Sequence, residues 1–293
     1  QTGTDQIFSI CGEVIHEYGL EEAIRDGHLS KYFYYVERVS LTDDESEDYN
    51  SMMAEIGIWL ARVRDSGGNL NFNSLPEHVQ ILIFQAKNII KKAEMKTGKC
   101  AEIVSQNYIG DGTQYWLVYC QDSEQLEEIR IELEGHRIGP VYVYWSGAEG
   151  ATVGDRSFKF ERKETLEMWE ETGGIMLAIQ CLDEGVNIEC ISHGIVLASS
   201  LNPRQFIQRR GRMLRLSENK THANIWDTLV IPNNQNAGGR GNYVLGELNR
   251  AWEFAQSADN VQALRELTNI RHELGLSDWF TDDAIEDEDD RNE

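Results

Sequence analysis

Short apolar segments alternate with amphipathic segments between about residues 115 and 231, and this alternation constrains the fold more than any other feature of the chain. The amphipathic segments show helical spacing, as in Leu126, Ile129 and Leu133, which follow a possible cap made by Asp122 and Gln125. Strand–helix alternation at this spacing predicts right-handed crossovers and a mostly parallel sheet covered on both faces. We therefore expect an α/β fold with about six strands. The apolar segments read as strands are "YWLVYC" (115–120), "VYVYW" (141–145), "GIMLAI" (174–179), "ISHGIVLA" (191–198) and "ANIWDTLVI" (223–231).

The regions on either side of this alternation have helical patterns instead. Thr42 and Glu45 match a capping box in front of an apolar stripe at helical spacing. Ser74 and Glu77 match a second box, and Gly67–Gly68 lies between the two patterns, so we expect a helical hairpin. Residues 243–275 carry a further amphipathic pattern, which predicts a helical C-terminal extension.

The charge of the chain limits the partners it can bind. The formal net charge is -23, which repels nucleic acid in bulk, so DNA binding requires local basic patches. Residues 282–293 hold eight carboxylates and one arginine, a net -7, as is typical of a solvated, disordered tail.

The cysteines and the hydropathy of the chain indicate the cellular compartment to expect. The five cysteines are scattered and form no C-x-x-C pair, which argues against a disulfide framework or a zinc site. We find no signal segment and no apolar run near 18 residues. We expect a soluble, cytoplasmic protein with no membrane partner and no bound metal of its own.

Against this acidic background, "NPRQFIQRRGRMLR" (202–215) gathers five arginines in fourteen residues. Guanidinium groups bind phosphate oxygens through paired hydrogen bonds and stay charged at working pH. Arg209, Arg212 and Arg215 are three residues apart, so on a helix they spread across one broad face. Two readings follow from the residues alone: a solvated basic helix paired with the many carboxylates, or a phosphate-binding site.

The spacing Q-R-x-G-R-x-x-R, from Gln208 to Arg215, resembles motif VI of superfamily 2 helicases and translocases. The resemblance implies that Arg212 and Arg215 reach across a cleft to the phosphates of ATP. It also implies that Gln208 lies close to the nucleotide and the attacking water, and that Arg209 belongs with the nucleotide-contacting residues. We expect Arg212 and Arg215 to be surface residues, whose replacement costs within about 0.5 kcal/mol of stability.

The segment "IMLAIQCLDEGVNI" (175–188) resembles motif V of the helicase branch that contains restriction-enzyme translocating subunits and repair helicases. Asp183–Glu184 follows an apolar strand and so resembles a Walker B box, whose acidic residue holds Mg²⁺. We reject this interpretation, because the pair lies about 25 residues before the arginine motif, which is the position of motif V. In motif V the glycine, here Gly185, brings backbone near the nucleotide. Asn187 stands where an acidic residue often contacts the ribose, so its side chain can hydrogen-bond but carries no charge.

Three further stretches extend the resemblance over roughly residues 7–232. "YWLVYCQD" resembles motif IV, and "VYWSGAEG" (143–150) resembles a loop that meets the nucleic-acid backbone, which makes Ser146 and Gly147 candidate contacts; an ordinary strand end is the alternative. An N-terminal stretch resembles the segment that leads into the second RecA-like domain of this branch. The fold expected is therefore RecA-like.

A P-loop needs G-x-x-x-x-G-K-[S/T], and the nearest string, "TGKC" (97–100), lacks both the first glycine and the hydroxyl residue. We interpret this string as a helix end with a capping glycine. The first RecA-like domain, which would bind ATP and Mg²⁺, is then expected elsewhere, in the same or a separate chain.

These observations predict five regions: a linker segment (1–41), an inserted helical hairpin (42–98), a second RecA-like helicase domain (99–232), a helical extension (233–278) and an acidic tail (279–293). The function expected is the second motor domain of an ATP-dependent DNA helicase or translocase, with phage defence, restriction or repair as plausible settings. On its own this chain should not hydrolyse ATP. The alternative is a non-catalytic RecA-like module that binds nucleic acid or a partner protein. His193, beside an apolar strand, is expected to be structural.

Overall fold

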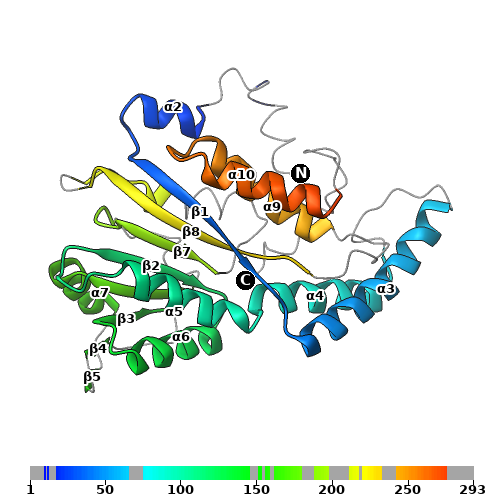
Figure 1. Cartoon of the computed structure of the whole chain (residues 1–293), viewed down its shortest axis with the longest axis horizontal. Coiled ribbons are helices and arrows are strands. Elements are labelled where there is room, and N and C mark those ends of the chain that lie inside the picture. Colours follow the sequence, from blue (N-terminus) through cyan, green and yellow to red (C-terminus); the bar gives the residue numbers. More distant parts are fainter. Residues whose placement is uncertain are drawn as a thin grey trace.

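The computed structural model describes residues 10, 12, 18–65, 75–145, 151–153, 156–158, 162–179, 188–197, 211–217, 220–232 and 242–275. These residues form an eight-stranded sheet flanked by helices (Figure 1). The elements are α2 (Leu20–Arg25), β1 (Lys31–Val39), α3 (Asp43–Asp65), α4 (Glu77–Lys92), α5 (Met95–Asn107), β2 (Tyr115–Cys120), α6 (Ser123–Gly135), β3 (Val141–Tyr144), β4 (Ala151–Val153), β5 (Arg156–Phe158), α7 (Arg162–Thr172), β6 (Gly174–Ile179), β7 (His193–Val196), β8 (His222–Val230), α9 (Asn242–Gln256) and α10 (Gln262–Glu273).

The sheet has the order β1-β8-β7-β2-β6-β3-β4-β5. Every pairing from β1 to β3 is parallel, which confirms the expected α/β fold with a six-stranded parallel sheet. The short strands β4 and β5 extend it as an antiparallel hairpin, which we did not expect. The sixth parallel strand is β1, at residues that we expected in the linker segment; it pairs with β8 from Lys31↔His222 to Val39↔Val230.

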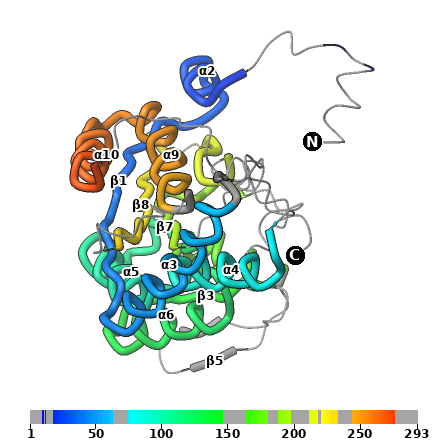
Figure 2. The backbone as a smooth tube through the Cα atoms, turned by 90° about the vertical axis from the view of Figure 1, so that its right-hand side faces the viewer, coloured from blue at the N-terminus to red at the C-terminus, as the bar shows by residue number. Residues whose placement is uncertain are grey.

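Strand β2 shows how alternation divides the core. Leu117 and Tyr119 face a cluster that contains α7, α9 and α10, whereas Trp116 and Val118 face one that contains α5 and α6. Figure 2 shows α9 and α10 on one side of the strands and α5 and α6 on the other. Because both faces are covered, the strands read as continuous apolar runs.

Helices α3 and α4 form the expected hairpin, and they pack on Val39 and Val230 at the carboxyl ends of β1 and β8. The capping box is confirmed: the Thr42 amide donates to Glu45 Oε2 at 2.8 Å, and the Glu45 amide donates to Thr42 Oγ1 at 3.3 Å. Helix α4 begins at Glu77, with Pro76 as its N-cap residue; Ser74, expected to cap this helix, lies outside the described residues.

Residues 97–100 correct another expectation. Thr97–Cys100 lies within the first half of α5, not at a helix end, and Cys100 is fully buried against the sheet. The cap of α6 is confirmed, since Asp122 accepts from the Gln125 amide at 3.0 Å.

The C-terminal extension forms α9 and α10 as expected, and Leu248, Phe254 and Leu267 join the core cluster. The acidic tail lies outside the described residues. Among the helices that the structure describes, none combines the length and apolar character that crossing a membrane requires.

Candidate functional site

The candidate residues from the sequence fall into two groups. Gly185, Asn187, Gln208, Arg209, Ser146 and Gly147 lie outside the described residues. In the chain, Ser146 and Gly147 come after β3, Gly185 and Asn187 after β6, and Gln208 and Arg209 after β7. Arg212 and Arg215 are described.

Residues 211–213 are helical and Leu214 is in a turn; we call residues 211–214 the arginine turn, which contains Arg212 and directly precedes Arg215. Arg212 is 8% exposed, and Arg215 is half-buried. The Arg215 amide donates to the Arg212 carbonyl at 3.4 Å. The expectation that Arg212 is a surface residue is therefore wrong, because the turn packs directly on the sheet.

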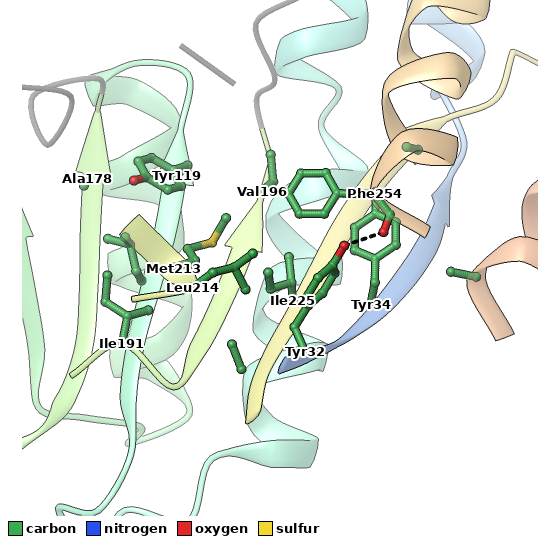
Figure 3. Close-up of a cluster of buried hydrophobic side chains, with 14 of the residues drawn as sticks. Tyr32, Tyr34, Tyr119, Ala178, Ile191, Val196, Met213, Leu214, Ile225 and Phe254 are labelled. Carbon is green, nitrogen blue, oxygen red and sulfur yellow. Dashed lines mark hydrogen bonds between the residues drawn. The ribbon is translucent and has the colours of Figure 1, made fainter. Parts of the chain in front are cut away.

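The two residues between these arginines fix the turn to the core. Met213 and Leu214 are fully buried and lie beside Ile191, Val196 and Ile225 (Figure 3). Gly194 on β7 permits this approach, since a Cβ atom at that position would overlap Met213 Sδ. Arg212 and Arg215 are thereby held on either side of an apolar anchor.

The backbone of the turn accepts hydrogen bonds from two residues that lie next to the sheet. Lys220 Nζ donates to the Met213 carbonyl at 3.0 Å and to the Ile191 carbonyl at 2.9 Å. The Leu214 carbonyl accepts from the Ser30 amide at 2.7 Å and from Ser30 Oγ at 3.1 Å. Ser30, Ile191 and Lys220 directly or closely precede β1, β7 and β8. The turn therefore lies at the amino-terminal ends of these strands.

Side chains also bond the carboxyl end of β7. Lys96 Nζ on α5 donates to the Leu197 carbonyl at 2.5 Å, and Thr228 Oγ1 donates to the Val196 carbonyl at 3.1 Å. Burial lowers the pKa of Lys96 to about 8, although Glu247 and Asp227 oppose this shift. The carboxyl end of β7 is thus hydrogen-bonded by side chains from α5 and β8.

A buried ionic network joins α9 to the sheet next to Lys96. Arg250 binds both carboxylate oxygens of Asp227, at 2.6 and 3.2 Å, and Glu247 at 2.9 Å. Tyr34 Oη donates to Asp227 Oδ2 at 2.7 Å. Burial lowers the pKa of Arg250, but the carboxylates of Asp227 and Glu247 raise it well above its ordinary value. The pairing satisfies charges that would otherwise be costly to bury.

His193 has a structural setting, in line with expectation. Its ring stacks on Trp116, with centroids 4.5 Å apart, and its Nδ1 lies 2.7 Å from Ser192 Oγ. Burial lowers its pKa to about 4, so the imidazole is neutral at physiological pH.

Residues 95–217, from the first residue of α5 to just beyond the arginine turn, match the family model described as "Helicase conserved C-terminal domain". This stretch is similar to the helicase C-terminal domain family. The match includes four parallel strands and ends with the segment that carries Arg212 and Arg215. The matched stretch begins at α5 and excludes β1 and β8, which belong to the same sheet.

Solved structures resemble the chain at low sequence identity. The ATP-dependent Type ISP restriction-modification enzyme LlaBIII bound to DNA is 14% identical, with a TM-score of 0.46; the match covers 86% of this chain and 16% of that one. A fragment of a putative HsdR subunit of a type I restriction enzyme from Vibrio vulnificus is 17% identical, with a TM-score of 0.45 and coverages of 78% and 37%. The SWI2/SNF2 ATPase core from Sulfolobus solfataricus in complex with dsDNA is 12% identical, with a TM-score of 0.47 and coverages of 83% and 48%. No curated protein matches in sequence.

The sequence analysis missed the residues that support the site. Asp227 carried a visible signal, because a carboxylate inside the apolar segment "NIWDTLV" needs a buried partner. Lys96, Lys220 and Ser30 carried none, since their partners are main-chain carbonyls, which have no signature in the sequence.

Proposed function

We propose that this helicase domain is the second motor domain of an ATP-dependent DNA helicase or translocase. Arg212 and Arg215 act on ATP held by a first RecA-like domain, whose P-loop this 293-residue sequence does not contain. The observation that carries the proposal is the family match to residues 95–217, which ends on these two arginines.

The chemistry of phosphoryl transfer supports this role for the arginines. Negative charge spreads over the transferred phosphoryl group in the transition state, and an arginine supplied from a neighbouring domain is worth roughly 10³- to 10⁵-fold in rate in well-studied NTPases. Such a residue must be held in position, and the turn of residues 211–214 is anchored by Met213, Leu214 and Lys220.

The remaining candidates complete the proposed site. Gln208 and Arg209 would contact the nucleotide with the arginines. Gly185 would bring its backbone near the nucleotide, and Asn187 would contact the ribose. Ser146 and Gly147 would contact the DNA backbone. Mg²⁺ would be bound by the first domain. Phage defence, restriction and repair are settings in which such a motor works.

The test compares this chain alone with the same chain joined to its first RecA-like domain. We expect DNA-stimulated phosphate release only from the complete enzyme, because positioning and charge neutralisation both need the two halves. Phosphate release by this chain alone, abolished by Arg212→Ala, would contradict the proposal. The alternative, a non-catalytic binding module, is supported if the gene and its neighbours encode no P-loop domain.

A further inference from the structure

Lys220 is buried beside the arginine turn and takes no part in the chemistry proposed above. Its Nζ donates to the carbonyls of Met213 and Ile191, at 3.0 and 2.9 Å. One carbonyl belongs to the turn and the other to the residue that closely precedes β7. A single ammonium group thus joins the turn to the strand that runs beneath it, and charge-assisted bonds of this kind are stronger than neutral ones.

The anchor is close to both arginines in the chain. Met213 directly follows Arg212, and Leu214 directly precedes Arg215. The Leu214 carbonyl accepts hydrogen bonds from Ser30, which precedes β1, and the Met213 carbonyl accepts one from Lys220, which precedes β8. Two consecutive carbonyls of the turn are therefore bonded by residues at the amino ends of two different strands. Any rotation of the peptide between Met213 and Leu214 breaks one of these bonds and turns at least one arginine away from its present direction.

We propose that Lys220 is a positioning residue that fixes the direction of Arg212 and Arg215 by holding the Met213 carbonyl. This inference rests on the proposed function, in that these two arginines act on ATP. Lys220 touches no substrate, and its effect is transmitted through the backbone of the turn. A displacement of 1 Å in a catalytic group can cost roughly 100-fold in rate.

The electrostatic surroundings of Lys220 fit this role. Burial lowers its pKa to about 8, and the Cys190 thiol is the group that opposes the shift. Burial in turn raises the pKa of Cys190 to about 12, so this thiol is uncharged at physiological pH. The two carbonyl bonds are therefore what holds the ammonium group in place.

The first experiment measures amide hydrogen exchange in this chain, without ATP, for Lys220→Met, Lys220→Arg and Ser30→Ala. We expect faster exchange in Lys220→Met confined to peptides from 211–217, a smaller change in Ser30→Ala, and partial recovery in Lys220→Arg. Ile129→Ala is the matched control, because it removes a buried side chain from α6 on the opposite face of the sheet. Unchanged exchange at 211–217 in Lys220→Met, or the same change in Ile129→Ala, overturns the proposal.

The second experiment measures ATP turnover by the complete enzyme. We expect Lys220→Met to lower kcat roughly 10- to 100-fold with KM little changed, and Lys220→Arg to lie between it and the wild type. Should Lys220→Met lower kcat no more than Ile129→Ala while Arg212→Ala abolishes turnover, the positioning role is refuted and the proposed function stands. If Arg212→Ala leaves kcat unchanged, the proposed function itself fails, and the exchange data report separately on the anchor. Ser30→Ala extends the test if Lys220→Met does not fold.

Discussion

At the scale of single residues, burial decides which side chains have shifted pKa values and which contribute to the packing of the core. Arg212 was expected at the surface, but its neighbours Met213 and Leu214 are core residues that draw the whole turn inward. His193 was correctly interpreted as structural, because a histidine next to an apolar strand commonly packs. Local capping was also predictable, as Thr42–Glu45 and Asp122–Gln125 show, since each cap depends on residues three apart.

His193 should make stability depend on pH. Its pKa is lowered to about 4 by burial, against 6.5 when unfolded, so the unfolded chain binds a proton first. Stability is fully present above pH 6.5 and is lost as pH falls towards 4, by about 2 kcal/mol between pH 7 and pH 5. Urea unfolding of the wild type and His193→Asn at both pH values measures this difference. An identical pH dependence in the two proteins would show that the ring is not buried in this way.

At the scale of elements, the sequence predicted the helices and strands whose hydrophobic pattern can be recognised within their own residues. The central strands and α6 have apolar runs or stripes that need no distant partner to be recognised. Strand β1 was missed because its pairing partner, β8, begins almost 200 residues later. In addition, several of its residues are half-exposed, so it lacks the continuous apolar run of the central strands. Helix α5 was hidden by Gly98, which suggested a terminus rather than a helix interior.

The attachment of α9 to β8 should depend on the pair formed by Arg250 and Asp227. Arg250→Met leaves Asp227, which is 1% exposed, buried without its cation, and we expect a loss of roughly 3–5 kcal/mol in urea unfolding. The double variant Arg250→Met/Asp227→Leu should recover part of this loss, because the buried charge of Asp227 is removed together with its cation. The control is Lys31→Met, which removes an exposed partner of Asp259 and should cost less than about 1 kcal/mol. Equal losses for Arg250→Met and Lys31→Met would mean that the network contributes nothing specific.

At the scale of the whole molecule, the parallel α/β architecture was predictable, and the supporting contacts of the candidate site were not. Alternation and motif order gave a parallel α/β sheet, because these properties follow the chain. The bonds from Lys220, Lys96 and Ser30 join residues that only the folded sheet brings together, and carbonyl acceptors have no signature in sequence. The net charge of -23 is also a property of the whole molecule.

That charge should limit DNA binding by this chain. Few cations are available for phosphate contacts, so we expect weak affinity that falls steeply with added salt through counterion release. Removal of residues 282–293 takes away a net charge of -7 and should raise affinity at low salt. Fluorescence anisotropy of labelled duplex and single-stranded DNA across a salt series measures both effects. Tight binding that salt does not weaken would contradict electrostatic recognition through local patches.

The most direct test of the central claim is the ATP turnover of the complete enzyme carrying Arg212→Ala, Arg215→Ala or Arg210→Ala, measured together with its affinity for ATP. Arginines aimed at charge that develops in the transition state lower the barrier more than they tighten the ground state. We predict that the first two variants lose orders of magnitude in kcat with much smaller changes in ATP affinity, that lysine at either position restores little, and that Arg210→Ala stays near the wild type. Urea unfolding of each variant shows whether the buried Arg212 also contributes to stability. Turnover that is unchanged in Arg212→Ala and Arg215→Ala, in domains that remain folded, would contradict the account.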